Sequence, residues 1–270
     1  MKILTTGIGS GLGKYIHETW GAAGLGRGTS LEEWENLRQT SWDVIIHCAF
    51  RNERSIESRK IYPYFQDNFL LTEKLTSFPH RKFVFFSSVD VYPKDDRLHA
   101  EEESIHLEEL DSSYAHAKLF SESIVREKSR DFLILRCTSL LGSQMRRNTL
   151  IRILEGGEEP LNLSLDSELN YIRYADVSSF IRKAVEKSWK GIYNLASSSN
   201  ISLGEAVELI GKRPRFGPYR YEVGRIDNRK AASLFPAFSY SSKEILTRFL
   251  AEDWPKRKVG SEFSVQCEQP

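Results

Sequence analysis

The amino-acid sequence predicts an α/β fold: a doubly wound parallel sheet followed by a small C-terminal α/β lobe. Short apolar runs alternate along the chain with segments of helical periodicity, and a glycine cluster follows the first run. The runs are apolar on both faces, which is typical of strands buried in a parallel sheet. Strands of this kind, each followed by a helix, form a sheet that helices cover on both sides.

The predicted elements follow in chain order. We expect strands over residues 2–6, 22–28, 43–49, 82–86, 131–136, 171–174 and 191–195. We expect helices over residues 12–20, 31–39, 61–78, 112–129, 149–154, 176–187 and 202–210. Two of these helices begin with a capping box, in which a serine and a glutamate three residues later bond each other's backbone N–H. The two pairs are Ser30 with Glu33 and Ser202 with Glu205.

The regular alternation of strands and helices changes near residue 140, which indicates two parts. We expect residues 1–140 and 172–200 to form the core, and residues 141–171 and 201–255 to form a substrate lobe. Residues 256–270 are predicted to be a polar tail.

The composition is that of an ordinary soluble protein. The chain has 270 residues, 28% of them charged, with a formal net charge of +1. It therefore gives no electrostatic basis for a nucleic-acid or membrane partner, and we expect neither. Cys48, Cys137 and Cys267 are widely spaced and form no Cys-x-x-Cys pair, so we expect no disulfide framework and no zinc site. No signal-peptide pattern is present, and a cytoplasmic location follows as the expectation.

A glycine-rich turn lies between the first predicted strand and the first predicted helix. Glycines there let backbone N–H groups approach a pyrophosphate and place it at a helix N-terminus. The alternative is a merely flexible turn, but the strand and helix around it favour the nucleotide site. The candidate residues are Gly7, Gly9, Ser10, Gly11, Leu12 and Gly13.

Two further sites carry candidate catalytic groups. Tyr114 and Lys118 are four residues apart on a predicted helix, so they share a face. The ammonium should lower the pKa of the phenol below its usual value of about 10 and suit Tyr114 to proton transfer. Ser88 follows a buried strand and is positioned to bond a substrate oxygen. Taken alone, the first motif is compatible with chance and Ser88 with an ordinary polar strand end.

The order of these sites resembles the short-chain dehydrogenase/reductase superfamily. Further segments resemble its extended branch, the NAD-dependent epimerase/dehydratase family that acts on sugar nucleotides. The likeness covers nearly the whole chain to about residue 250. The segments that carry it are Ser87-Ser88-Val-Asp-Val-Tyr92, Tyr114-x-x-x-Lys118-x-x-x-Glu122, and residues 43–49 with Asn68, 135–142, 171–176 and 191–196.

The resemblance implies a Rossmann fold and a role for each motif. Tyr114 would be the acid/base, Lys118 would hold the nicotinamide ribose and tune Tyr114, and Ser88 would bind the reacting oxygen. Helices around Asn68 and Tyr114 would pair in a homodimer. The implied cofactor-binding residues are Gly7, Gly11 and Gly13 at the pyrophosphate, with Cys48, Ala49 and Asn68 near the nicotinamide and Tyr114 and Lys118 shared with the catalytic set.

Two departures from the family concern the cofactor. The turn is spaced Gly-x-x-x-Gly-x-Gly instead of the extended branch's Gly-x-x-Gly-x-x-Gly. One strand–helix unit before Asp43 is missing, which resembles the compact reductases of dTDP-4-keto-6-deoxy sugars. No acidic residue ends the second strand; Arg27 stands there with Thr29 and Ser30. An arginine suits a 2′-phosphate, so we expect NADP(H) in preference to NAD(H), unless Arg27 is a solvated loop charge.

Two other departures concern the substrate. Val89 and Asp90 replace the Asp-Glu pair of the family's dehydratases, so elimination of water is not expected. Asp90 is then either a second acid/base or a solvated carboxylate. The family often has an arginine that contacts the nucleotide diphosphate, and Leu169-Asn170-Tyr171 occupies its place in this sequence. Other arginines would have to take its place unless they are surface charges, and the candidates are Arg146, Arg147 and Arg215, with Arg152 and Arg213 as further possibilities.

The leading hypothesis is NAD(P)-dependent reduction of a keto-sugar, specifically a nucleotide-linked 4-keto-6-deoxy sugar, with Tyr114 as proton donor. The alternative within the family is epimerisation of a sugar nucleotide with tightly bound NAD. A non-catalytic dinucleotide-binding scaffold is the hypothesis from another class, although such proteins usually lose the tyrosine or the lysine.

Overall fold

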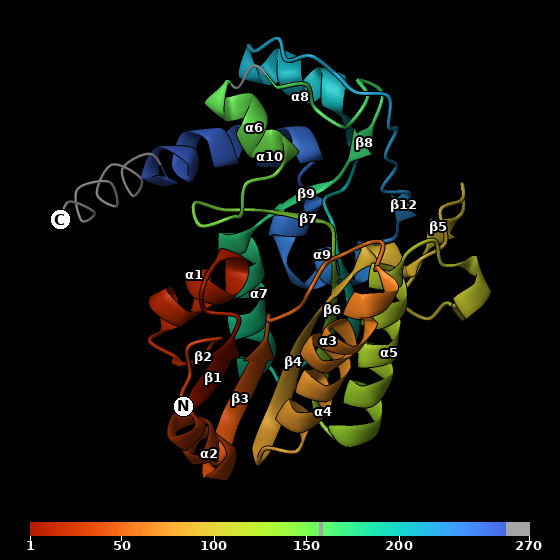
Figure 1. Ribbon diagram of the computed structural model, residues 1–270. Helices are drawn as coiled ribbons and strands as arrows, with labels where there is room; N and C mark the ends of the chain where they lie inside the picture. The colour runs from red at the N-terminus through yellow and green to blue at the C-terminus, as the bar shows by residue number, and fades with distance from the viewer. Residues whose placement is uncertain (157–158, 258–270) are drawn as a thin grey trace, which may run out of the picture.

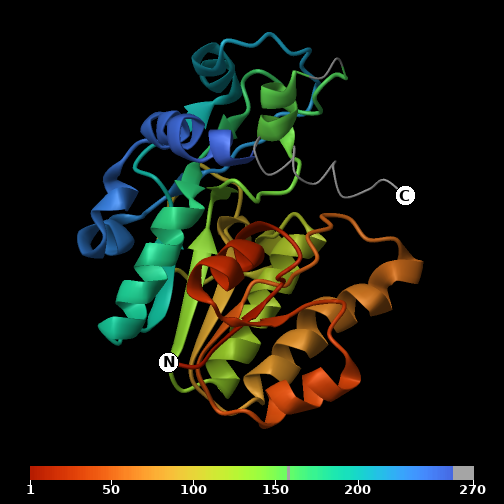
Figure 2. The same cartoon turned by 90° about the vertical axis from the view of Figure 1, so that its left-hand side faces the viewer.

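The computed structural model describes residues 1–156 and 159–257. Figures 1 and 2 show a central sheet between two layers of helices, with a second region above the carboxyl ends of the strands. The predicted polar tail lies outside the described residues from 258 onward, as does Cys267. No helix of the described part is long and apolar enough to cross a bilayer.

The central sheet is parallel throughout, in the order β10-β6-β4-β3-β1-β2. The strand order reverses at β1, so the crevice where such sheets bind ligands lies at the carboxyl ends of β1 and β3. One strand lies beyond β1 in the described sheet, where the usual arrangement has two; the predicted loss of a strand–helix unit is confirmed. The strands are β1 Ile3–Thr6, β2 Ala23–Leu25, β3 Trp42–His47, β4 His80–Ser88, β6 Phe132–Cys137 and β10 Gly191–Leu195.

The helices cover both faces, as the doubly wound prediction requires. On one face, Val44, Ile46 and Val84 of the sheet pack with α1 and α7, while Ile45 and Phe83 pack with α2, α4 and α5 on the other. Adjacent residues of one strand thus enter opposite cores, which is why the strands are apolar without alternation. These helices are α1 Gly11–Trp20, α7 Tyr174–Glu186, α2 Leu31–Gln39, α4 Leu71–Thr76 and α5 Ser113–Lys128.

The long helix predicted over residues 61–78 is present but irregular. It consists of α3 (Ile61–Phe65), a π-helical turn (Gln66–Leu70) and α4. Both predicted capping boxes are formed, at Ser30 and at Ser202. A third, between Ser241 and Glu244, opens the helix α10 (Ser242–Glu252), which we did not predict.

The second region is built from short pairs of strands and four helices of the described chain. Its pairs are parallel β7 (Ser139–Leu141) with β9 (Tyr171–Arg173), antiparallel β8 (Glu168–Leu169) with β11 (Ile201–Ser202), and parallel β5 (Leu98–His99) with β12 (Arg225–Ile226). Its helices are α6 Thr149–Glu155, α8 Leu203–Ile210, α9 Arg229–Leu234 and α10. Short 3₁₀ turns occur at Ser58–Lys60, Val89–Val91, Leu107–Glu109 and Pro236–Ser239.

Candidate active site

The glycine turn at the end of β1 is shaped by close backbone packing. Gly7 has φ +75°, and a Cβ there would lie 2.9 Å from the backbone N of Ala49. A Cβ at Gly13 would lie 2.5 Å from the carbonyl oxygen of Gly7. Gly11 opens α1 with φ +66°. Side chains at Gly7 and Gly13 would push the first strand, the turn and the helix apart, and the positive φ of Gly11 disfavours a side chain there, so the glycines are structural requirements of the turn.

A cavity of about 460 Å³ lies against this turn, and we call it the dinucleotide cavity. Three arginines contribute to its wall, and the amino end of α1 adds its partial positive charge. The close backbone approach, the helix end and the cations together fit a dinucleotide. The lining residues are Thr6, Gly7, Gly9, Ser10, Leu25, Gly26, Arg27, Trp34, Ala49, Phe50, Arg51, Asp67, Leu71 and Arg146.

Other predicted cofactor residues lie behind this wall. Leu12 is buried in the core. The backbone N–H of Cys48 donates to Thr6 Oγ1 at 3.1 Å. Asn68 is buried on the π-helical turn; its Oδ1 accepts from the backbone N of Arg51 at 2.8 Å and its Nδ2 donates to the carbonyl of the same residue. Asn68 therefore positions the chain at Arg51.

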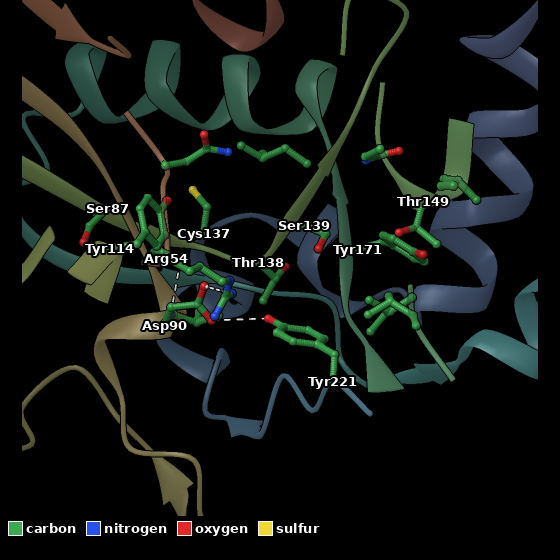
Figure 3. A pocket seen from close by; sticks show the side chains of 18 of the residues that line it. Arg54, Ser87, Asp90, Tyr114, Cys137, Thr138, Ser139, Thr149, Tyr171 and Tyr221 are labelled. Atoms are coloured by element: carbon green, nitrogen blue, oxygen red, sulfur yellow. Dashed lines mark hydrogen bonds and ion pairs between the residues drawn. The ribbon is translucent and has the colours of Figure 1, made fainter. Parts of the chain in front are cut away.

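A second cavity, of about 520 Å³, lies where β4 and β6 face the second region, and we call it the catalytic cavity. Ser88 and Tyr114 both stand in its wall. Figure 3 shows Tyr114 there, beside Cys137 and Arg54. Phe50 joins the two cavities, because it lines the dinucleotide cavity and its ring centre is 6.0 Å from that of Tyr114. The lining residues are Asn52, Arg54, Ser87, Ser88, Val89, Asp90, Tyr114, Cys137, Thr138, Ser139, Leu140, Asn148, Thr149, Leu150, Leu163, Leu169, Tyr171, Tyr219 and Tyr221.

The helix α5 holds Tyr114 and Lys118, the candidate catalytic pair, one turn apart. The Ser112 hydroxyl caps this helix by accepting from the backbone N of Ala115. Lys118 Nζ donates to the carbonyl oxygen of Phe86 at 2.5 Å and lies 3.6 Å from the centre of the Phe50 ring. Its burial lowers the pKa of Lys118 to about 7.

The prediction that Lys118 lowers the pKa of Tyr114 is wrong. The pKa of Tyr114 is raised well above its ordinary value, first by burial and then by the negative charge of Asp90, while a hydrogen bond with Ser88 lowers it in part. The Lys118 ammonium is directed to the Phe86 carbonyl and lies 5.6 Å from the centre of the Tyr114 ring. The raised pKa favours the protonated phenol, which is the form that can donate a proton.

A buried ion pair fixes α5 to the strands behind the catalytic cavity. Arg136 on β6 donates from Nη2 and Nε to the two carboxylate oxygens of Glu122, at 2.7 and 3.0 Å. The Ser87 hydroxyl donates to the same carboxylate at 2.5 Å, and Arg136 Nη1 donates to Tyr92 at 2.9 Å. Glu122 thus ties the helix of Tyr114 to the strand end that carries Ser88.

Asp90 is buried in the cavity wall and is not a solvated carboxylate. Arg54 Nη2 donates to it at 2.6 Å, Lys94 Nζ at 2.9 Å and the Tyr221 hydroxyl at 3.2 Å. Figure 3 shows Arg54 and Tyr221 directed at this carboxylate. Sequence reasoning missed both residues, since each lies far from Asp90 in the chain and in no recognisable motif.

The three candidate substrate arginines lie in different places. Arg146 Nε donates to Ser10 Oγ at 2.8 Å, at the glycine turn. Arg147 pairs with Glu155 at 2.9 Å on the surface. The backbone carbonyl of Arg215 accepts from the backbone N of Leu161. Among the described residues, Arg54 is the arginine that lines the catalytic cavity.

A parallel sheet with this order, and a glycine turn where the order reverses, defines a Rossmann-type dinucleotide-binding protein. The model of the "NAD dependent epimerase/dehydratase family" matches residues 27–196, and the chain belongs to that family. It is therefore an NAD(P)-dependent enzyme. The matched range begins after the glycine turn, whose spacing departs from the family's usual one.

Solved structures with the same fold include reductases and an epimerase. The chain is similar to dTDP-4-dehydrorhamnose reductase from Yersinia enterocolitica, with 22% identity, a TM-score of 0.74, and 93% of this chain and 98% of that chain covered. It is also similar to the corresponding reductase from Bacillus anthracis in complex with NADP, with 19% identity, a TM-score of 0.72, and 93% of this chain and 100% of that chain covered. The chain is similar as well to UDP-glucuronic acid 4-epimerase from Bacillus cereus in complex with UDP-glucuronic acid and NAD. Here the identity is 18% and the TM-score 0.73, with 96% of this chain and 99% of that chain covered. No curated protein matches this chain in sequence.

Proposed function

We propose that this enzyme reduces the carbonyl group of a nucleotide-linked 4-keto-6-deoxy sugar, with NADP(H) as cofactor. The observation that carries the proposal is the position of Ser88 and Tyr114 in one cavity wall, next to the dinucleotide cavity across Phe50. The region above the sheet supplies the opposite wall, with Leu163, Tyr171 and Tyr221, and serves as the substrate lobe.

The chemistry divides between the cofactor and the chain. When bound, the nicotinamide supplies a hydride to a carbonyl carbon. Ser88 holds the carbonyl oxygen by a hydrogen bond, and the Tyr114 hydroxyl gives that oxygen its proton. The tyrosinate left behind regains a proton from solvent. Lys118, fixed by the Phe86 carbonyl, is placed to hold the ribose of the cofactor.

The environment of Tyr114 suits the role of proton donor that reduction requires. Burial and the negative charge of Asp90 raise the pKa of its phenol, which disfavours the tyrosinate. The fold is shared about equally with dTDP-4-dehydrorhamnose reductases and with a UDP-glucuronic acid 4-epimerase, so the choice of a reductase rests on the site.

The reaction is tested with purified enzyme and NADPH. Oxidation of one NADPH per nucleotide-linked 4-keto-6-deoxy sugar consumed would support the proposal. The same assay with the free keto-sugar tests whether the nucleotide is needed. Interconversion of UDP-sugar epimers without net NADPH consumption would contradict the proposal and support an epimerase.

The preference for NADP(H) is proposed from Arg27. Its side chain stands exposed in the wall of the dinucleotide cavity, and no acidic residue occurs between residues 22 and 30 to repel a 2′-phosphate. Arg27→Ala should weaken NADPH binding by roughly 10- to 100-fold, the range of a charge-assisted hydrogen bond, and leave NADH binding nearly unchanged. Nicotinamide fluorescence titration measures both. Arg38→Ala, on the exposed part of α2, is the control, and tight NAD(H) binding indifferent to Arg27 would refute the preference.

We also propose that the enzyme is a homodimer through α3 and α5. Phe65 and Phe120 are 42% and 41% exposed, and Phe69 lies between them with ring distances of 4.9 and 5.7 Å. An exposed aromatic patch of this kind is typical of an interface. Combining Phe65→Glu with Phe120→Glu should convert a dimer to a monomer in sedimentation, whereas Leu31→Glu on α2 should not. A wild-type monomer would contradict the proposal.

A further inference from the structure

We propose that Arg146 binds the pyrophosphate of the dinucleotide, and that the segment 142–147, here called the strap, completes the cofactor site from the side of the second region. Sequence reasoning placed Arg146 with the substrate. Its guanidinium instead lies at the glycine turn, where Nε donates to Ser10 Oγ at 2.8 Å. Arg146 shares the wall of the dinucleotide cavity with Gly7 and Gly9.

The Ser10 side chain is available for this contact. Ser10 precedes α1 at the position where a serine often caps the helix, yet its side chain makes no capping bond. Its hydroxyl accepts from Arg146 instead, so the guanidinium is held beside the amino end of α1. A planar group with several N–H donors at that point matches the oxygens of a pyrophosphate.

The strap is fixed to its surroundings at several points. Its backbone crosses the start of α1, where the carbonyl of Gln144 accepts from the N–H of Gly11 at 2.9 Å. Arg257 Nη1 donates to the carbonyls of Ser143 and Met145 at 3.2 and 2.6 Å. Met145 is buried in the main core. Figure 1 shows the chain between β7 and α6 passing close to α1. Arg146 is therefore carried on a held backbone and does not depend on a free loop to reach the turn.

The charges of the cavity wall divide between two phosphate positions. Arg51 is already paired with Glu53 at 2.8 Å and with Asp67 at 3.3 Å. Arg27 and Arg146 both line the cavity and have no carboxylate partner among the described residues. Arg27 follows the end of β2, whereas Arg146 bonds Ser10 just before α1. We assign Arg146 to the pyrophosphate, common to NADH and NADPH, and Arg27 to the 2′-phosphate of NADPH.

The strap also connects the two cavities. Ser139 and Leu140 precede it and Asn148 and Thr149 follow it, and all four line the catalytic cavity. One continuous stretch of chain therefore contacts the substrate side at both ends and the cofactor in its middle.

The test is a titration of the substrate-free enzyme with NADPH and NADH, followed by nicotinamide fluorescence. Arg146→Ala should lower the binding affinity for NADPH and for NADH equally, by roughly 10- to 100-fold. Arg147→Ala is the matched control, because Arg147 is the next residue in the chain but its side chain pairs with Glu155 on the surface. Arg27→Ala should lower the binding affinity for NADPH alone. The two variants together therefore distinguish the 2′-phosphate position from the pyrophosphate position.

Two results would overturn the inference. The first is unchanged affinity of Arg146→Ala for both cofactors, with or without a raised KM for the sugar; a raised KM would return Arg146 to the substrate. The second is selective loss of NADPH, which would place Arg146 at the 2′-phosphate. Thermal unfolding shows whether the variant is folded, and Arg146→Lys, which keeps the charge but not the planar fork, should bind with intermediate affinity. Because no substrate is present, the result stands even if the proposed reduction fails.

Discussion

Replacing Tyr114 with phenylalanine is expected to lower kcat by about 10²- to 10⁴-fold, the usual contribution of a positioned general acid. The change removes only the hydroxyl, so the phenyl ring still fills the wall between Phe50 and the catalytic cavity. Affinity for NADPH should therefore stay within about twofold, because a change of less than about 0.4 kcal/mol is expected in binding. Steady-state kinetics and fluorescence titration measure the two quantities separately.

The control for this variant is Tyr219→Phe. Tyr219 lines the same cavity from the substrate lobe, and its side chain is 55% exposed. Loss of its hydroxyl should leave kcat nearly unchanged. A Tyr114→Phe enzyme with near-normal kcat would remove the tyrosine from the mechanism and, with it, the proposed reaction.

Local patterns predicted the parts of the site that depend on local structure. The glycine turn follows from a strand, a short run of small residues and a helix within residues 3–20. Tyr114 and Lys118 share a helix face because they are four residues apart. That spacing does not determine where a long side chain ends, and Lys118 reaches the Phe86 carbonyl on β4. Burial and the charge of Asp90 instead raise the pKa of Tyr114, so the predicted direction of the shift was wrong although the two residues are neighbours.

Parts of the site that depend on distant contacts could not be predicted. Tyr221 meets Asp90 across 131 positions of the sequence, and neither residue lies in a motif that announces the other. Strands such as β7 and β9 have three residues each, and they pair residues as far apart in the sequence as Ser139 and Tyr171. By contrast, the sequence did contain the signal for α10, because Ser241 and Glu244 have the same capping-box spacing as Ser30 and Glu33.

The second large effect is expected at Glu122, which connects the site to the fold. Glu122→Ala should destabilise the protein by about 3–5 kcal/mol, since it leaves the Arg136 guanidinium buried without its carboxylate. The two side chains are 2% and 3% exposed, so water does not replace the lost partner. For a chain of this size the midpoint of thermal unfolding should fall by roughly 6–20 °C. Glu127→Ala, on the exposed side of the same helix, is the control.

A double variant separates the charge from the packing. Glu122→Leu combined with Arg136→Met removes both charges and keeps apolar volume, so its cost should be clearly smaller than that of Glu122→Ala. Ser87 and Tyr92 also lose a partner in this variant, at the strand end that carries Ser88. We therefore expect the double variant to regain much of its stability relative to Glu122→Ala, while its kcat stays below that of the wild type. Equal destabilisation by the single and the double variant would show that the uncompensated charge of Arg136 is not the cause.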